Sequence, residues 1–176
     1  MDQKVAKLDQ FYTKPDKAEI LYNKVFEFYE SDDFDKFIEP SCGECSFYHL
    51  MPQKKRIGID LDPPEQAYRR DKAGTLIRDA KIIKMDFLSF AETYKRLEVS
   101  TNQRIIVIGN PPFGTGSSLA VKFFNSCALY CDVIAFIIPR TFKRISIQNK
   151  LDLNFHLVYG EDLPYDNKNC IFTHYR

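Results

Sequence analysis

The residues best suited to chemistry come directly after residues 105–108, four β-branched residues that predict a buried strand of a parallel sheet. Asn110, Pro111 and Pro112 end that strand, because each proline holds the residue before it in an extended conformation. An amide side chain and backbone carbonyls are therefore expected at the strand's carboxyl end, with Phe113 next in the chain. Ligands of open α/β sheets bind at this edge. An amide and a carbonyl beside an aromatic ring could hold a flat group that carries an amine.

Three acidic residues, Glu39, Asp60 and Asp86, each end another predicted strand. Glu39 runs into a loop of small residues, 40–47, which leads to a short helix. This order is typical of nucleotide-binding turns, where the helix N-terminus carries partial positive charge. Asp60 follows Glu39 by about 20 residues, the usual spacing for an acid that binds ribose hydroxyls. The acids predict a nucleotide-like ligand at the same edge of the sheet.

Two cysteine pairs offer another kind of site. Cys42-x-x-Cys45 and Cys127-x-x-x-Cys131 could together supply four zinc ligands. The first pair lies in a glycine-bearing loop, and the second lies one helical turn apart in an apolar helix, where small buried thiols are common. We therefore expect no metal. The five cysteines are an odd number, which disfavours a closed disulfide framework.

Alternating strands and helices are expected to position these residues. Strands are predicted at residues 34–39, 56–60, 81–87, 105–108, 133–138, 155–159 and 169–175, with a loop at 160–167; helices are predicted at 16–29, 65–73, 90–97 and 117–130, with a short one ending at residue 50. Asp16 is the expected N-cap of the first helix, and Ser117 or Ser118 that of the last. The pattern predicts an α/β fold with a doubly wound, mostly parallel, seven-stranded sheet. Residues 1–176 are expected to form one domain.

The composition limits the kinds of partner that the chain is expected to bind. At 176 residues with 44% hydrophobic residues, the chain can bury an ordinary core. No apolar run approaches the roughly 20 residues that span a bilayer, and the first residues lack a signal peptide's apolar core, so we expect a cytoplasmic protein without a membrane partner. The net charge is +1, from 25 basic and 24 acidic residues. A nucleic-acid partner would therefore need locally gathered basic residues, a partner chain or a further recognition domain.

Taken in order, these motifs resemble those of class I S-adenosylmethionine-dependent methyltransferases of the N6-adenine type, over nearly the whole chain. Asn-Pro-Pro-Phe at 110–113 is similar to the family's motif for methylating an exocyclic amine of a nucleic-acid base. Residues 39–47 resemble the family's acid-Pro-x-x-Gly-x-Gly-x-Phe cofactor loop, and residues 12–15 resemble the N-terminal motif that closes over the methionine end. The order of these motifs matches the arrangement called gamma. The implied fold is the Rossmann-like class I methyltransferase fold.

The resemblance implies roles for individual residues. S-adenosylmethionine would be bound by Tyr12, Thr13, Glu39, Pro40, Ser41, Gly43, Asp60, Leu61, Asp86, Phe87 and Asn110. Catalysis would fall to Asn110, Pro111, Pro112 and Phe113, which would hold the amine and stack on the base. Arg140, Lys143 and Arg144 follow the fifth strand and are candidate phosphate contacts, or else a solvated loop.

The expected activity is methylation of adenine N6 in nucleic acid, with DNA slightly favoured over structured RNA such as rRNA. The alternatives are a catalytically weak scaffold subunit, or methylation of cytosine N4 or a protein glutamine. Two departures from the family pattern bear on the choice. Cys45 replaces the loop's second glycine, which would cost about 1 kcal/mol or more if that position needs a positive φ. No segment corresponds to the separate recognition domain that gamma-type DNA enzymes usually carry.

Overall fold

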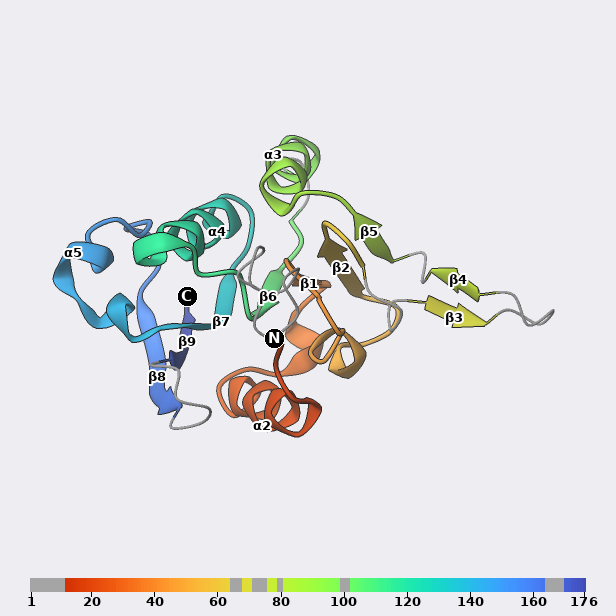
Figure 1. Cartoon of the computed structure of the whole chain (residues 1–176), viewed down its shortest axis with the longest axis horizontal. Coiled ribbons are helices and arrows are strands. Elements are labelled where there is room, and N and C mark those ends of the chain that lie inside the picture. Colours follow the sequence, from red (N-terminus) through yellow and green to blue (C-terminus); the bar gives the residue numbers. More distant parts are fainter. Residues whose placement is uncertain (1–11, 64–67, 71–75, 79–80, 99–101, 164–169) are drawn as a thin grey trace.

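Seven strands form one twisted sheet in the order β5-β2-β1-β6-β7-β9-β8 (Figure 1). The computed structural model describes residues 12–63, 68–70, 76–78, 81–98, 102–163 and 170–176. The sheet comprises β1 (Lys36–Glu39), β2 (Arg56–Asp60), β5 (Ile82–Lys84), β6 (Ile105–Gly109), β7 (Val133–Pro139), β8 (Leu157–Leu163) and β9 (Cys170–Tyr175). The first five of these are parallel, whereas β9 runs antiparallel to β7 and to β8. The predicted seven-stranded, mostly parallel sheet is confirmed.

Helices cover both faces of the sheet. They are α2 (Pro15–Val25), α3 (Phe87–Glu98), α4 (Ser118–Ala128) and the short α5 (Ile145–Gln148), with 3-10 turns η1 (Ser31–Asp33), η2 (Tyr48–Leu50), η4 (Thr115–Ser117) and η5 (Arg140–Lys143). Figure 1 shows α3 and α4 on one face and α2 on the other. Among the described residues, no helix has both the length and the apolar character that crossing a bilayer requires.

The uniformly apolar central strands divide their side chains between these two layers. On β7, Ile134, Phe136 and Ile138 belong to the core that includes α3 and α4, whereas Val133, Ala135 and Ile137 belong to the core that includes α2. Successive residues of a strand point to opposite faces, so a strand buried on both sides needs an unbroken apolar run. This requirement explains why the run at 133–138 predicts a central strand.

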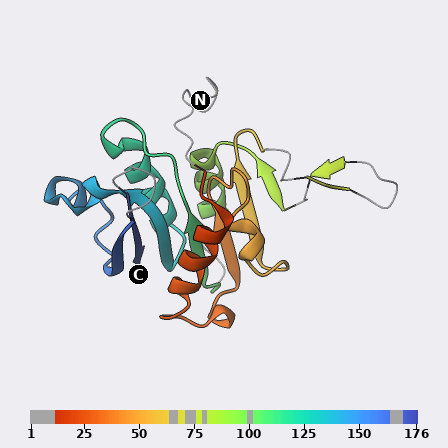
Figure 2. The ribbon, with the colours of Figure 1, turned by 60° about the horizontal axis from the view of Figure 1, so that its bottom comes forward.

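The predicted helix at 65–73 is wrong where the structure describes it. Tyr68–Arg70 forms β3, which pairs antiparallel with β4 (Leu76–Arg78), and the rest of the predicted helix lies outside the described residues. Figures 1 and 2 both show this pair extending well beyond β5, at the end of the molecule opposite β8. Strands this short carry too few residues for an alternating pattern, so their charged residues were compatible with a solvated helix face.

Several predicted element ends also differ from the structure: α2 ends at Val25 and not at residue 29, β5 ends at Lys84 and not at residue 87, and α3 begins at Phe87 and not at residue 90. Helix α2 begins at Pro15 with Lys14 as its N-cap residue, so Asp16 lies in the first turn and does not cap the helix. Proline suits this first position because its missing N–H would have no partner within the helix. Strand β8 runs to Leu163, so residues 160–163 belong to an edge strand and not to the expected loop.

A buried histidine on β9, His174, packs against the segment that follows α2. His174 has no exposed surface, and the rings of Phe28, Tyr29 and Tyr159 lie 4.7, 5.5 and 5.8 Å from its own ring. Neither ring nitrogen has a hydrogen-bond partner within the part of the chain that the structure describes. Burial lowers the pKa of His174 to about 4, because the charged imidazolium would lose its hydration there.

We expect this histidine to make the protein less stable in mild acid. Between about pH 6.5 and pH 4 the unfolded chain binds a proton at His174 and the folded protein does not, so the free energy of unfolding decreases as the pH falls. The melting temperature should drop by about 2–4 °C for each kcal/mol lost in a protein of this size. His174→Phe, compared with wild type by thermal unfolding at pH 7 and pH 5, should reduce the drop.

Replacing the exposed His156 by Asn is the matched control and should leave the drop unchanged. An equal loss of stability on acidification in wild type and H174F would contradict the role of His174.

Candidate functional site

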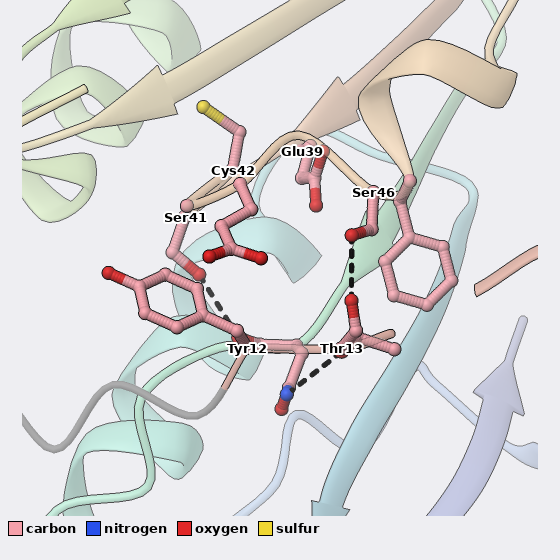
Figure 3. A pocket seen from close by; sticks show the side chains of 10 residues that line it. Tyr12, Thr13, Glu39, Ser41, Cys42 and Ser46 are labelled. Atoms are coloured by element: carbon pink, nitrogen blue, oxygen red, sulfur yellow. Dashed lines mark hydrogen bonds between the residues drawn. The ribbon is translucent and has the colours of Figure 1, made fainter. Parts of the chain in front are cut away.

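The carboxyl ends of β1, β2 and β6 meet at one edge of the sheet. Because β1 pairs with β2 on one side and with β6 on the other, Glu39, Asp60 and Asn110 are brought to neighbouring positions. A pocket opens at this edge (Figure 3) and is lined by Tyr12, Thr13, Glu39, Ser41, Cys42, Gly43, Glu44, Ser46, Phe47 and Asn110. The amide, the first acid and the small-residue loop predicted from the sequence therefore share one pocket.

Backbone hydrogen bonds hold the loop 40–47 against β2. The N–H of Cys42 donates to the carbonyl of Ile59 at 2.9 Å, and the N–H of Gly43 donates to Oδ2 of Asp60 at 2.9 Å. The other oxygen of Asp60 accepts the N–H of Asp62, also at 2.9 Å. The carboxylate of Asp60 is thus buried by the loop that it orients, and Gly43 is presented to the pocket.

A second set of hydrogen bonds joins this loop to β6 and to the segment before α2. The hydroxyl of Ser41 donates to the carbonyl of Asn110 at 3.2 Å, and the hydroxyl of Ser46 donates to the carbonyl of Thr13 at 2.7 Å. Nδ2 of Asn110 donates to the hydroxyl of Thr13 at 3.1 Å. Figure 3 shows these contacts joining segments far apart in the sequence around one pocket.

Gly43 leaves room for an aromatic ring. Its φ is +46°, and a Cβ at this position would lie 3.1 Å from two ring carbons of Tyr12. Any larger residue would therefore push Tyr12 away and strain the backbone. The glycine lets Tyr12 lie directly against the loop at the mouth of the pocket.

Cys45 occupies the position where the family resemblance expects a second glycine, and its φ is +65°. The position therefore does use the left-handed region, as the resemblance suggested. The residue is held there by three contacts: its N–H donates to the Cys42 carbonyl at 2.6 Å, its Sγ donates to the Gly43 carbonyl at 3.7 Å, and its own carbonyl accepts the N–H of His49 at 3.1 Å. The surrounding loop fixes this conformation in spite of its strain of about 1 kcal/mol or more.

Glu39 brings a buried carboxyl group to the floor of the pocket. It is 3% exposed, and its Oε2 has no hydrogen-bond partner among the residues that the structure describes. Burial raises the pKa of Glu39 well above its ordinary value; the nearby Cys45 and Asp60 add to this, and a hydrogen bond from the backbone of Tyr48 opposes it. A protonated Glu39 can donate a hydrogen bond, whereas its carboxylate would accept one from a cationic ligand.

Five of the predicted cofactor residues do not line the pocket: Pro40, Asp60, Leu61, Asp86 and Phe87. The Met85 N–H donates to the Asp60 carbonyl at 2.9 Å, which brings the end of β5 next to Asp60. Asp86 accepts hydrogen bonds from the N–H and hydroxyl of Ser89 at 2.9 and 3.1 Å, at the start of α3. Phe87 is buried with its ring 4.7 Å from that of Phe123, and Leu61 is 55% exposed.

The residues after Asn110 connect the pocket to α4. Pro111 is buried and Pro112 is half-buried, and the carbonyl of Phe113 accepts the N–H groups of Leu119 and Ala120, both at 3.1 Å. The half-buried ring of Phe113 packs against both cores. Its backbone is therefore fixed at the start of α4, beside the strand end that carries Asn110.

The basic residues after β7 are exposed and partly neutralised. Arg140 and Lys143 both pair with Oδ1 of Asp162 on β8, at 3.3 and 2.9 Å, and Arg144 is exposed. The hydrogen bond from Lys143, followed by the charge of Arg140, lowers the pKa of Asp162. A short hydrogen bond between the Ser117 and Thr141 hydroxyls joins this segment to the turn after Phe113.

Four pocket residues were not among the predicted site residues: Cys42, Glu44, Ser46 and Phe47. All four lie within the loop motif at 39–47, so membership of that motif was the available signal. Among the described residues, no three His, Cys, Asp or Glu side chains are placed to hold a metal ion, so the two cysteine pairs do not come together as a zinc site.

Comparisons with known proteins identify the fold. No protein-family model and no curated protein matches the sequence. Among solved structures, a proposed RNA methyltransferase of Pyrococcus horikoshii is 16% identical, with a TM-score of 0.53, 96% of this chain covered and 87% of that one. TrmN of Thermus thermophilus is also 16% identical, with a TM-score of 0.60 and coverages of 93% and 49%. A proposed class I S-adenosylmethionine-dependent methyltransferase of Listeria monocytogenes is 12% identical, with a TM-score of 0.57 and coverages of 97% and 64%. The chain therefore has the class I methyltransferase fold.

The buried Glu39 leads to a prediction about stability. The folded protein retains its carboxyl proton at pH values where the unfolded chain, with a pKa near 4.5, has released it, so this residue destabilises the fold as the pH rises above about 4.5. Glu39→Gln should therefore gain stability relative to wild type between pH 5 and pH 8, as measured by denaturant unfolding at each pH.

Glu44→Gln is the matched control, since it changes an exposed carboxylate of the same pocket, and should show no such trend. A stability difference between E39Q and wild type that does not change with pH would contradict this electrostatic description.

Proposed function

We propose that this protein transfers the methyl group of S-adenosylmethionine to the exocyclic N6 of an adenine in nucleic acid. The observation that carries the proposal is the placement of Asn110. Its side chain lines the pocket formed by Glu39 and the loop 40–47, and the two prolines that follow hold this strand end extended. The acceptor amine and the methyl donor would thus be held at adjacent positions on one sheet edge.

The chemistry of the residues around the pocket supports the proposed cofactor. The carboxyl oxygen of Glu39 that has no hydrogen-bond partner among the described residues is buried in a pocket that Glu44 also lines, so acidic groups face the site of a ligand with ammonium and sulfonium charges. Gly43 provides the close approach of backbone that such a loop needs, and we assign Asp60, which accepts the Gly43 N–H at the end of β2, to the ribose hydroxyls. The residues that would hold it are Tyr12, Thr13, Glu39, Pro40, Ser41, Gly43, Asp60, Leu61, Asp86, Phe87 and Asn110.

Asn110 would activate the amine by accepting its hydrogens. When bound, S-adenosylmethionine supplies an electrophilic methyl group, so the protein needs only to position and polarise the nucleophile. The lone pair of adenine N6 is conjugated into the ring. Hydrogen bonds from the amine to Oδ1 of Asn110 and to the carbonyl of Pro111 would draw the nitrogen toward tetrahedral geometry and free that lone pair. The bond from Nδ2 to Thr13 fixes the orientation of the carboxamide for this task.

Phe113 would hold the base. Its carbonyl accepts hydrogen bonds from the first turn of α4, and it directly follows the two prolines in the chain. Stacking of a base on an aromatic ring is worth about 1–3 kcal/mol and tolerates any base. The target adenine must leave its stack or come from a single strand to reach this pocket.

Basic residues in two regions support a nucleic-acid substrate. Arg140, Lys143 and Arg144 lie in the segment joined by Ser117 and Thr141 to the turn after Phe113. Residues 68–84, which include the projecting β3–β4 pair, carry a net charge of +4 in a chain whose net charge is only +1. Local concentration of basic residues is the condition that a nearly neutral chain must meet to bind phosphates.

We further propose that residues 1–176 form one catalytic domain and that a partner chain or a further domain recognises the target.

RNA is the first substrate to test, because one similar structure is described as a proposed RNA methyltransferase. Incubation with isotopically labelled S-adenosylmethionine and adenine-containing RNA or DNA, followed by mass spectrometry of the nucleosides, should identify N6-methyladenosine or its deoxy form. Detection of the label on cytosine N4 or on a protein glutamine would identify a different methyl acceptor. Cofactor binding without any methyl transfer would indicate a scaffold.

Asn110→Ala should separate binding from chemistry. The variant should bind S-adenosylmethionine with nearly unchanged affinity in calorimetry, because the carboxamide is only one of many contacts. Methyl transfer should fall by about two orders of magnitude or more, the usual effect of removing one polar group that acts in the transition state.

The matched control is Asn154→Ala, which removes an exposed amide that donates to Asp152, two residues away in the chain. Methyl transfer by N110A at the wild-type rate would rule out the proposed role of Asn110.

A further inference from the structure

The two cysteines of the cofactor loop are held next to each other by a tight turn. The Cys45 N–H donates to the Cys42 carbonyl at 2.6 Å, which closes a turn over residues 42–45. Such a turn brings its first and last Cα atoms within about 7 Å, and disulfides join Cα atoms about 4.4–6.8 Å apart. The structure has no disulfide between them, and the Cys42 thiol makes a side-chain hydrogen bond with Cys45.

The two side chains pack with Tyr48 and Ile82 in a small buried cluster, but the proposed chemistry does not use their thiols. Cys45 occupies a left-handed position that glycine would fill without strain. The pair belongs to no metal cluster among the described residues, and methyl transfer from S-adenosylmethionine needs no thiol. A Cys-x-x-Cys turn in contact with a ligand pocket is, however, a suitable arrangement for thiol–disulfide exchange.

We propose that Cys42 and Cys45 form a reversible disulfide that weakens binding of the cofactor in the adjacent pocket. The inference rests on the proposed function, since it assumes that this pocket binds S-adenosylmethionine. The modifying reagent is a low-molecular-weight disulfide of the glutathione class.

The reaction balances as two successive exchanges. One cysteine, as the thiolate, attacks a sulfur of the small disulfide, which forms a mixed disulfide and releases one equivalent of the small thiol. The other cysteine then attacks the protein sulfur of the mixed disulfide and releases the second equivalent. The two cysteine thiols lose two electrons and two protons in total, and the small disulfide gains both to become two thiols.

The surroundings of the pair determine how a reagent reaches it and which state it rests in. Cys42 lines the pocket but is 3% exposed, and it packs with Cys45, Tyr48 and Ile82, so a reagent reaches its thiol when the loop opens locally. The hydrogen bond to Cys45, followed by burial, raises the pKa of the Cys42 thiol. The thiol form therefore predominates at neutral pH, and exchange should be faster at pH 8.5 than at pH 7.

A disulfide would change the loop that presents Gly43. Forming a bond of about 2.05 Å between the two sulfur atoms removes the Cys45 S–H, which now donates to the Gly43 carbonyl within the same turn. Cys42, Gly43 and Glu44 all line the pocket, so a distorted turn alters three neighbouring parts of its wall. We expect the affinity for S-adenosylmethionine to fall at least tenfold.

The test combines peptide mapping with calorimetry on the full chain. Protein equilibrated in buffers of reduced and oxidised glutathione is alkylated and digested with trypsin. The peptide of residues 37–54 holds Cys42 and Cys45 and no other cysteine, so the disulfide appears there as a loss of two hydrogens. The oxidised protein should then bind S-adenosylmethionine at least tenfold more weakly than the reduced protein.

A reciprocal measurement provides an independent test. If oxidation weakens cofactor binding tenfold, saturating cofactor must favour the reduced pair by the same factor. The midpoint potential of the pair should then become more positive by about 30 mV, the value for a tenfold change in a two-electron couple.

Two variants serve as controls. Cys45→Ser should bind the cofactor equally under reducing and oxidising conditions, whatever its absolute affinity. Cys127→Ala removes a buried thiol of α4 outside the pocket and should retain the full response. The inference is overturned if peptide 37–54 stays reduced across the glutathione series, or if its disulfide forms with affinity changed less than twofold. Failure of reduced wild type to bind the cofactor would instead reject the proposed function.

Discussion

The site depends on the hydrogen bonds that join the loop 40–47 to the strand ends on either side of it. Gly43 donates to Asp60 at the end of β2, and Ser41 donates to the Asn110 carbonyl at the end of β6. Each bond joins residues far apart in the chain, and the partners meet because β1 pairs with β2 on one side and with β6 on the other. The orientation of the loop is thus a consequence of strand order, and the loop in turn buries the carboxylate of Asp60.

Strand order also explains why the pocket lies at the carboxyl ends of β1 and β6. After β1 the chain builds outward through β2 and β5, and then returns across the sheet to add β6 on the other side of β1. Ligands of doubly wound sheets bind at such a reversal, because the connections leave the two neighbouring strand ends in opposite directions. Gly109 keeps the gap narrow: a Cβ there would lie 3.2 Å from Cδ of Pro40. The small residue before Asn110 therefore lets the ends of β6 and β1 approach closely.

The sequence was most informative where burial demands an unbroken apolar run. Residues 105–108 and 133–138 had to be central strands, and the acids and amide at strand ends then had to share one edge. The β3–β4 pair could not be predicted, because Tyr68–Arg70 is too short and too charged to show a period. Phe87 illustrates another limit: an aromatic residue after an acid suits both a ligand contact and a core, and here the ring packs beside Phe123. Glu44 and Ser46 belong to the loop motif, but polar residues are ordinary in any loop, so the motif did not single them out as pocket residues.

Cys45 stands where the family motif has glycine, yet the loop keeps its left-handed turn and gains a second thiol. The left-handed conformation costs a non-glycine residue about 1 kcal/mol or more, which is comparable to one net hydrogen bond. Cys45 takes part in several, including those to Cys42, Gly43 and His49, so the turn remains closed without glycine. A serine could make similar bonds at this position, but only a thiol can also react with Cys42. Cysteine at this position therefore leaves the turn closed and supplies the second thiol that the proposed disulfide requires.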